Sequence, residues 1–284
     1  MIIQKSNFSS KAKLYLVPTP IGNFDDMTYR SVEVLNTVDI VFAEDTRVTK
    51  VLLSHFNITT PLMSYHIFNE QSQADEIIKY LHEEKNIALV SDAGLPGISD
   101  PGYLITKKAI DLGFDVVALP GANAALTALI ASGIPSDKFF FYGFLKHKLS
   151  QKEKELKDLV DYHETIIFYE SPHRIKETLM AINKVFGNRE VVVARELTKK
   201  FEEYIRGKIQ EIVDADLEFK GEIVIIVKGA EIKKQVEQLN SMTISDHYQY
   251  YLNQEYDSKE AMKMVAKDRG CSKSIIYKEL QQKN

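Results

Sequence analysis

The feature that most constrains this chain is an apolar run that leads straight into a glycine-rich loop. Ile87–Val90 is apolar throughout, and the stretch Leu89–Gly102 reads LVSDAGLPGISDPG, with three glycines and two prolines. A short apolar run bounded by turn residues predicts a buried strand. The glycines can take positive φ and leave no Cβ, so a ligand can approach the backbone closely.

This loop has two interpretations. In open α/β sheets, ligands bind beyond the carboxyl ends of the strands, which is where the loop lies. The alternative is an elaborate strand-to-helix turn, in which Asp92 or Asp100 caps a helix that begins near Pro101. One loop alone favours neither interpretation.

Other predicted strands end in similar loops. Lys13–Val17 leads into PTPIGN (18–23), and Val116–Leu119 leads into PGANAALTALIASG (120–133). Helical segments separate the strands, and this alternation predicts a parallel sheet with crossover connections. Three such loops at one sheet edge predict a binding pocket. PTPIGN has one glycine and two prolines rather than GxGxxG, which argues against NAD and FAD.

A fourth predicted strand, Val38–Ala43, runs into the charged sequence EDTR (44–47). Asp45 or Thr46 can cap the helix that follows. The same position at a strand end suits residues of a functional site, so both interpretations stay open.

The second half of the chain has a different pattern. Residues 136–154 have the composition of a domain junction, and short strands at 139–144, 165–169, 191–194, 204–206 and 223–227 follow. Short strands that return on one another predict a mixed or antiparallel sheet in an α+β domain. The predicted organisation is an N-terminal α/β domain (1–135), a C-terminal α+β domain (136–240) and a helical extension (241–284).

The extension reads as helix, glycine turn and helix around Gly270, which resembles a helix-turn-helix. Residues 244–284 carry 7 basic and 6 acidic side chains. That balance suits phosphate binding poorly, so a packing or docking appendage is the preferred interpretation.

Composition narrows the class of protein further. The chain has 284 residues, a net charge of −4 and a single cysteine, Cys271, which excludes an internal disulfide and fits a reducing cytoplasm. No stretch approaches the roughly 18 uninterrupted apolar residues of a membrane span, and the seven histidines show no metal-ligand spacing. Residues 1–120 carry 10 Lys+Arg against 15 Asp+Glu, whereas residues 146–200 carry 12 against 9. A nucleic-acid partner would therefore meet the second half, unless these lysines only solvate helices.

Taken together, the motifs resemble a known family. LVPTPIGN, AEDTR, LVSDAGLPGISDPG, LPGANAALTAL, FYESPHR and ARELTKKFEE follow one another across about Lys13–Gly229. This series is similar to the bacterial small-subunit ribosomal RNA methyltransferase I family, the cytidine-2′-O-methyltransferases of the tetrapyrrole methylase superfamily. The resemblance implies two α/β domains, a cleft for S-adenosylmethionine between them, and a homodimer. It also implies methylation of the ribose 2′-hydroxyl of a cytidine in the decoding region of 16S rRNA, with small-subunit rRNA or the 30S subunit as partner.

The resemblance further implies a set of donor-binding residues. Asn123 stands where many superfamily members have serine, and the second domain contributes weaker candidates. The set is Pro18, Thr19, Pro20, Gly22, Asp92, Ala93, Gly94, Leu95, Gly121, Asn123, Ala124, Tyr169 and Ser171.

A sulfonium methyl group is already electrophilic, so catalysis chiefly requires positioning and a group that helps remove the hydroxyl proton. The sequence does not choose among the candidates at strand ends, which are Glu44, Asp45, Asp100, Glu170, His173 and Arg174. Glu170 and Arg174 could equally form a structural i,i+4 pair. The expected RNA face comprises Lys146, Lys148, Lys152, Arg195, Lys199 and Lys200.

Two other functions stay open on the sequence. One is a superfamily enzyme that methylates a tetrapyrrole or a protein side chain. The other is a regulator that binds DNA through its terminal helices while the α/β part senses a small ligand.

Overall fold

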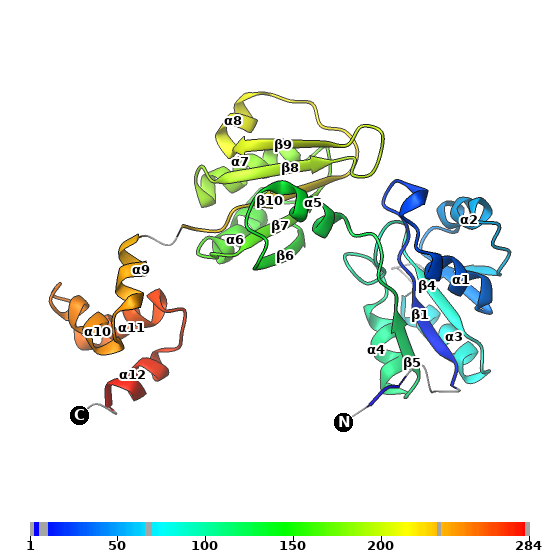
Figure 1. The fold of residues 1–284 in the computed structure, drawn as a ribbon, viewed down its shortest axis with the longest axis horizontal. Coiled ribbons are helices and arrows are strands. Elements are labelled where there is room, and N and C mark those ends of the chain that lie inside the picture. Colours follow the sequence, from blue (N-terminus) through cyan, green and yellow to red (C-terminus); the bar gives the residue numbers. More distant parts are fainter. Residues whose placement is uncertain (1–2, 6–10, 66–69, 232–233, 282–284) are drawn as a thin grey trace. The chain divides into compact units, whose positions relative to one another are not determined.

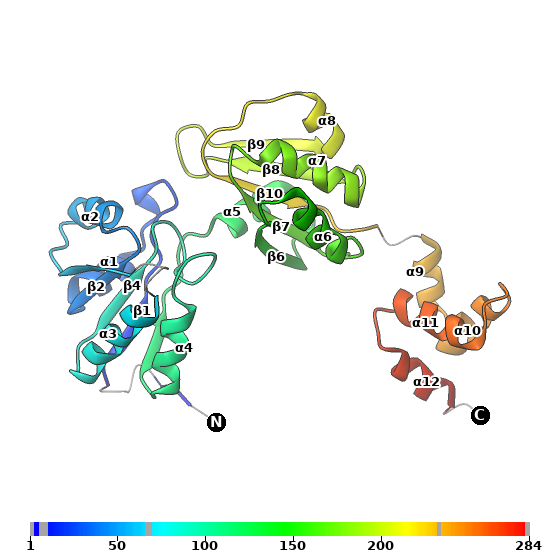
Figure 2. The same ribbon diagram turned by 180° about the vertical axis from the view of Figure 1, so that it is seen from behind.

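The structure is a computed structural model that describes residues 3–5, 11–65, 70–231 and 234–281. The chain divides into two compact units, Met1–Gly229 and Ala230–Asn284. The larger unit contains two five-stranded sheets (Figures 1 and 2).

The first sheet is parallel throughout, as the alternating sequence pattern predicts. Its strand order is β3-β2-β4-β1-β5, and every neighbouring pair runs in the same direction. The strands are β1 (Lys13–Leu16), β2 (Ile40–Ala43), β3 (Leu62–Ser64), β4 (Ile87–Val90) and β5 (Asp115–Ala118). β2 and β4 are buried along their whole length, which explains their continuous apolar sequences.

Helices cover both faces of this sheet. Side chains of α3 and α4 pack with Leu14, Phe42 and Leu89 on one face, and those of α1 and α2 pack with Val41 and Val90 on the other. The elements are η1 (Phe24–Asp26), α1 (Tyr29–Thr37), α2 (Thr46–His55), α3 (Glu70–His82) and α4 (Tyr103–Asp111). Both faces are therefore buried, as in doubly wound folds.

The second sheet is mixed, with the order β6-β7-β10-β8-β9. β6 pairs with β7 in parallel, and the other three pairs are antiparallel. The strands are β6 (Phe139–Phe144), β7 (Thr165–Glu170), β8 (Glu190–Arg195), β9 (Glu203–Lys208) and β10 (Ile223–Val227). The mixed sheet confirms the α+β character expected of the second half.

Different helices pack on the two faces of the second sheet. Residues of α6 (Leu149–Leu159), α7 (Ile175–Phe186) and α8 (Ile209–Asp214) pack on one face. α5 (Ala124–Ser132) packs against β7, β8 and β10 on the other face. α5 lies before residue 135, the domain boundary expected from the sequence, yet it packs on the second sheet. The chain therefore passes from the first sheet to the second in the loop between β5 and α5.

The smaller unit is helical and has its own apolar core. α9 (Lys234–Ser241), α10 (Ile244–Leu252), α11 (Ser258–Asp268) and α12 (Lys273–Gln281) surround Leu239, Tyr251, Val265 and Ile276. Asp257 caps α11 by accepting bonds from the Lys259 and Glu260 amides. Within the described ranges of the chain, no helix has the length and apolar character needed to cross a membrane.

Candidate functional site

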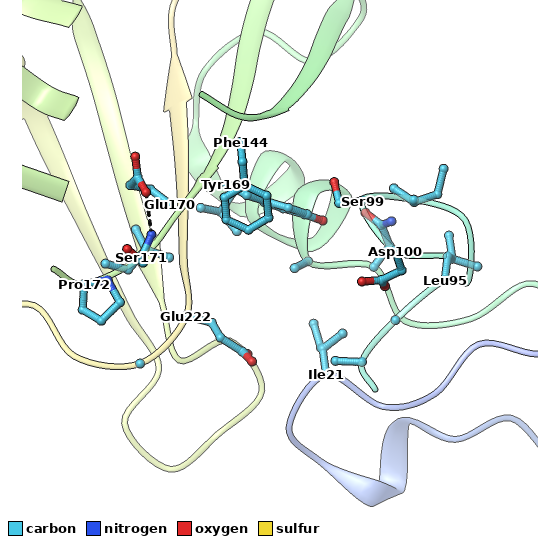
Figure 3. A pocket seen from close by; sticks show the side chains of 18 residues that line it. Ile21, Leu95, Ser99, Asp100, Phe144, Tyr169, Glu170, Ser171, Pro172 and Glu222 are labelled. Carbon is cyan, nitrogen blue, oxygen red and sulfur yellow. Dashed lines mark hydrogen bonds between the residues drawn. The ribbon is translucent and has the colours of Figure 1, made fainter. Parts of the chain in front are cut away.

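The loops after β1, β4 and β5 meet, as the sequence predicts, and they line one cavity together with the second sheet. The cavity has a volume of about 310 Å³ and takes its walls from both α/β parts of the larger unit (Figure 3). Nine of the expected site residues line it, and these are Ala93, Gly94, Leu95, Asp100, Asn123, Ala124, Tyr169, Glu170 and Ser171. The interpretation of these loops as a binding pocket is therefore favoured over a plain turn.

Backbone contacts hold the glycine-rich loop in shape. Thr19 and Gly94 exchange two backbone hydrogen bonds, of 2.9 and 3.0 Å, which form an antiparallel bridge between the loops after β1 and β4. The buried Thr19 hydroxyl donates to the Ser91 carbonyl oxygen at 3.0 Å, and the Ser91 hydroxyl donates to the Gly94 carbonyl oxygen at 3.1 Å. Gly94 adopts φ +81°, a conformation that suits glycine. Thr19 thus supports the cavity wall from behind.

Several expected donor-binding residues lie outside the cavity lining and have packing contacts instead. A Cβ on Gly121 would meet Pro18 Cγ at 2.3 Å, so this glycine allows the first and last loops to touch. A Cβ on Gly22 would meet Lys199 Cγ at 2.5 Å. Asp92 Oδ1 accepts a hydrogen bond from the Asp45 amide at 3.0 Å, which joins the loops after β2 and β4.

Asp100 is the acidic side chain whose ionisation the cavity changes most clearly. Burial raises its pKa to about 7, and the charges of Glu44 and Asp92 add to the effect, while a hydrogen bond with Ser91 opposes it. The alternative role for Asp100, capping the next helix, is wrong. α4 begins at Tyr103, and its N-cap is Gly102, with φ +143° and no capping side chain.

Glu170 also lines the cavity, but its carboxylate is engaged in the protein. One oxygen accepts the Ser171 amide at 2.8 Å (Figure 3) and the other accepts the Thr178 hydroxyl at 2.6 Å. Arg174 Nε lies 3.3 Å from Glu170 Oε1. The structure thus forms the i,i+4 pair that the sequence left as an alternative.

The remaining catalytic candidates differ in their surroundings. Asp45 caps α2 and forms a bidentate ion pair with Arg47, whose Nε and Nη2 donate to Oδ1 and Oδ2, and this pair lowers the pKa of Asp45 to about 2. His173 is exposed and lies outside the cavity lining. Asp45 therefore acts as the helix cap that the sequence offered as one interpretation.

The cavity is also lined by residues outside the expected set of site residues. Phe144 lies at the end of β6 and Glu222 just before β10 (Figure 3). A single aromatic or acidic residue gives no signal in a sequence, and Phe144 and Glu222 reach the cavity only because β6 and β10 both pair with β7. Ile98 and Ser99 belong to the glycine-rich loop itself, before α4.

One residue of the expected RNA face is wrongly assigned. Lys152 is fully buried, and its ammonium donates to Glu177 at 2.7 Å and to the Thr178 hydroxyl at 2.8 Å. Lys146, Lys148 and Lys200 are exposed. They remain accessible to a polyanion.

Two further cations of that set are paired with carboxylates. Arg195 Nε lies 2.5 Å from Glu203. Lys199 Nζ contacts Glu196 at 3.1 Å and Glu222 at 3.3 Å, and these contacts raise its pKa although burial opposes the change. To bind a phosphate group, Arg195 and Lys199 would have to give up their contacts with these carboxylates.

Comparison with known proteins identifies the kind of protein that this fold and cavity belong to. A family model described as Tetrapyrrole (Corrin/Porphyrin) Methylases matches residues 13–213. A Bacillus subtilis protein named Ribosomal RNA small subunit methyltransferase I is 50% identical over 98% of each chain. A protein of the same name from Halalkalibacterium halodurans is 47% identical over 94% of each chain.

Among solved structures, diphthine synthase matches with a TM-score of 0.61 and 12% identity, covering 76% of this chain and 90% of its own. At that identity the likeness concerns the fold, and it agrees with the two-sheet architecture. The sequence matches extend further, because they cover nearly the whole of each chain. The chain therefore belongs to the ribosomal RNA small subunit methyltransferase I family, within the tetrapyrrole methylases.

Proposed function

We propose that this methyltransferase transfers a methyl group from S-adenosylmethionine to the ribose 2′-hydroxyl of a cytidine in the decoding region of 16S rRNA. The observation that supports an rRNA substrate is the 50% identity, over 98% of each chain, with a relative named for that substrate. The cytidine and its 2′-oxygen rest on the motifs that resemble the cytidine-2′-O-methyltransferases. The proposal includes a homodimer that acts in the cytoplasm on small-subunit rRNA or the 30S subunit.

S-adenosylmethionine is the methyl donor of this family. The chemistry of the cavity fits a donor that carries positive charge and an aromatic base. Among the described residues that line the cavity, the charged side chains are Asp100, Glu170 and Glu222, and none is lysine or arginine. This set suits a sulfonium and an ammonium group and disfavours a cofactor that carries phosphates.

The apolar walls of the cavity suit the uncharged part of the donor. Ile21, Leu95 and Ala124 come from the first part of the chain, and Ile223 and Val224 come from β10. Gly94 brings its backbone to the cavity without a side chain. When bound, the donor supplies an electrophilic methyl group, so the residues of this chain need to hold the ribose oxygen in line and take its proton.

Asp100 is the residue proposed to take that proton. It lines the cavity, and its pKa of about 7 places it near the pH at which a general base works best. Glu170 and Asp45 are less suited, because each carboxylate is paired with an arginine, Arg174 and Arg47 respectively. With the donor bound, the carboxylate of Asp100 would accept the proton of the 2′-hydroxyl as the oxygen bonds to the methyl carbon and the donor's sulfur leaves as a neutral thioether.

A reconstituted reaction tests the proposal. The purified protein is incubated with labelled S-adenosylmethionine and 30S subunits from cells that lack this protein, and the rRNA is digested to nucleosides. The expected product is labelled 2′-O-methylcytidine. Label in a base-methylated nucleoside, or in ribosomal protein alone, would contradict the ribose assignment, and gel filtration of the same preparation reports whether the protein is a dimer.

A further inference from the structure

The last residue of β6, Phe144, is placed at the cavity by a bulge. In the parallel pairing of β6 with β7, Phe141 faces Ile167, Gly143 faces Phe168 and Phe144 faces Tyr169, so Tyr142 is the extra residue. Residues two apart on a strand share a face, so Ile167 and Tyr169 lie on one side together with their partners Phe141 and Phe144. Without the bulge, Phe144 would point to the opposite face of the sheet.

Glycine makes this bulge possible. Gly143 has φ +81°, and a Cβ at this position would lie 3.3 Å from the Ser99 hydroxyl in the loop that carries Asp100. The bulge thus brings the end of β6 against the loop of the proposed general base. Both Phe144 and Asp100 line the cavity.

The ring of Phe144 is fixed on one side and open on the other. It meets the Tyr169 ring edge to face at 5.6 Å between centroids, and Tyr169 in turn meets Phe141 at 5.0 Å. The side chain nevertheless remains 54% exposed. An aromatic ring held from one side, at the edge of an active-site cavity, presents a flat apolar face (Figure 3).

The backbone beyond Phe144 is also held firmly. Arg174 Nη2 donates to the Leu145 carbonyl oxygen at 2.7 Å and to the Lys146 carbonyl oxygen at 3.2 Å. The Lys146 amide donates to Glu155 at 3.0 Å. Arg174 of the ESPHR motif is therefore a positioning residue for this segment rather than a member of the cavity lining.

Exposed lysines follow Phe144 closely in the sequence. Lys146 and Lys148 are both exposed, two and four residues after the ring. Proteins recognise unpaired RNA by stacking bases on aromatic rings while basic side chains follow the phosphates. Phe144 provides a ring at the cavity that Asp100 also lines, and Lys146 provides an exposed cation two residues further along the chain.

We propose that Phe144 is the platform on which the target nucleobase, turned out of its helix, stacks during methyl transfer, with Lys146 contacting a neighbouring phosphate. This inference rests on the proposed function and adds a substrate-binding position to it. It also explains why the FFFYGF strand ends in an exposed aromatic ring at the cavity. We expect a nucleobase stacked on this ring to bring its ribose toward Asp100, because both residues line the same cavity.

The test compares three variants of the full-length protein: Phe144→Ala, Phe144→Trp and Phe139→Ala. Phe139 is a matched control, since it lies on the same strand, is 42% exposed and stays outside the cavity lining. Donor affinity is measured by calorimetry, KM for 30S subunits by methyl transfer at saturating donor, and binding of a fluorescein-labelled single-stranded oligocytidylate by anisotropy.

Stacking of one base is worth about 1–3 kcal/mol, which corresponds to about a 5- to 150-fold loss. Phe144→Ala should therefore raise the KM for 30S subunits and the dissociation constant for the oligonucleotide by such a factor. Phe144→Trp should restore most of the affinity for 30S subunits and for the oligonucleotide. Phe139→Ala should leave both affinities close to the wild-type values. The donor affinity of all three variants should stay close to that of the wild type.

Loss of donor binding in Phe144→Ala would overturn the proposal and assign the ring to the donor pocket. Equal effects of Phe144→Ala and Phe139→Ala would also overturn it, since they would indicate a general surface effect. A wild-type enzyme that binds the oligonucleotide through Phe144 yet methylates no rRNA would contradict the proposed function while leaving the stacking platform in place.

Discussion

At the scale of single residues, the chemistry depends on Asp100. Its raised pKa means that the carboxylate predominates only above about pH 7. A general base works in its deprotonated form, so the methylation rate at saturating substrates should rise about tenfold per pH unit below 7 and level off above it.

Asp100→Asn removes the base while keeping the shape of the side chain. We expect kcat to fall by about 10²- to 10⁴-fold and the rise with pH to disappear. Donor affinity should fall far less than kcat, because Asp100 is one of three carboxylates among the described residues that line the cavity. Because burial raises the folded-state pKa from 3.8 to about 7, this carboxyl lowers stability progressively as the pH rises between these values, and the full penalty remains at pH 8. The variant should therefore unfold at the same temperature as wild type or higher at pH 8. A variant that keeps the wild-type pH profile would exclude Asp100 as the base.

Gly94 tests the donor site itself. Valine there would be strained at φ +81° and would place a side chain at the cavity wall. Gly94→Val should weaken donor binding at least tenfold by calorimetry. Gly133→Val is the matched control, since Gly133 has φ +80° with open space around it and lies outside this cavity. Equal losses in both variants would show that backbone strain, rather than the cavity, is responsible.

At the scale of elements, Lys152 joins two helices rather than binding RNA. Lys152→Ala should reduce the free energy of unfolding by about 2–4 kcal/mol, because a buried side chain is lost and Thr178 and Glu177 lose a donor. Lys154→Ala, on the exposed side of the same helix, should have little effect. Urea denaturation measures both, and similar stabilities of the two variants would contradict the structural role.

The sequence predicts the elements well where the pattern is strong and fails where it is weak. The runs 87–90, 139–144 and 223–227 become β4, β6 and β10 with the expected bounds. β3 is not predicted, because its three half-buried residues show no alternation of apolar and polar side chains. α9 is not predicted, because its sequence is mostly polar.

The site is partly predictable for a physical reason. Glycines and acidic residues at strand ends mark the loops, so Gly94 and Asp100 can be found from local sequence. Burial depends on what folds over a residue, so neither the enclosure of Lys152 nor the position of Glu222 beside the cavity follows from the chain alone.

At the scale of the whole molecule, the division at Gly229 predicts how the helical extension behaves. No described residue after Val224 lines the cavity, so ending the chain at Gly229 should leave donor affinity unchanged and lower activity on 30S subunits if the extension positions RNA. Ending it at Thr243 would retain α9 but remove most of the core around Leu239, so that protein should aggregate more readily. Loss of donor binding in a folded 1–229 protein would show that the extension builds the pocket.

The central claim is ribose methylation of a 16S rRNA cytidine by this cavity. The most direct measurement maps 2′-O-methylation across the rRNA of cells that have the protein, lack it, or carry it as Asp100→Asn. The account predicts one cytidine in the decoding region that is methylated in the first cells and unmethylated in the other two. Full ribose methylation of that cytidine in cells without the protein, or a change at a base instead, would contradict it.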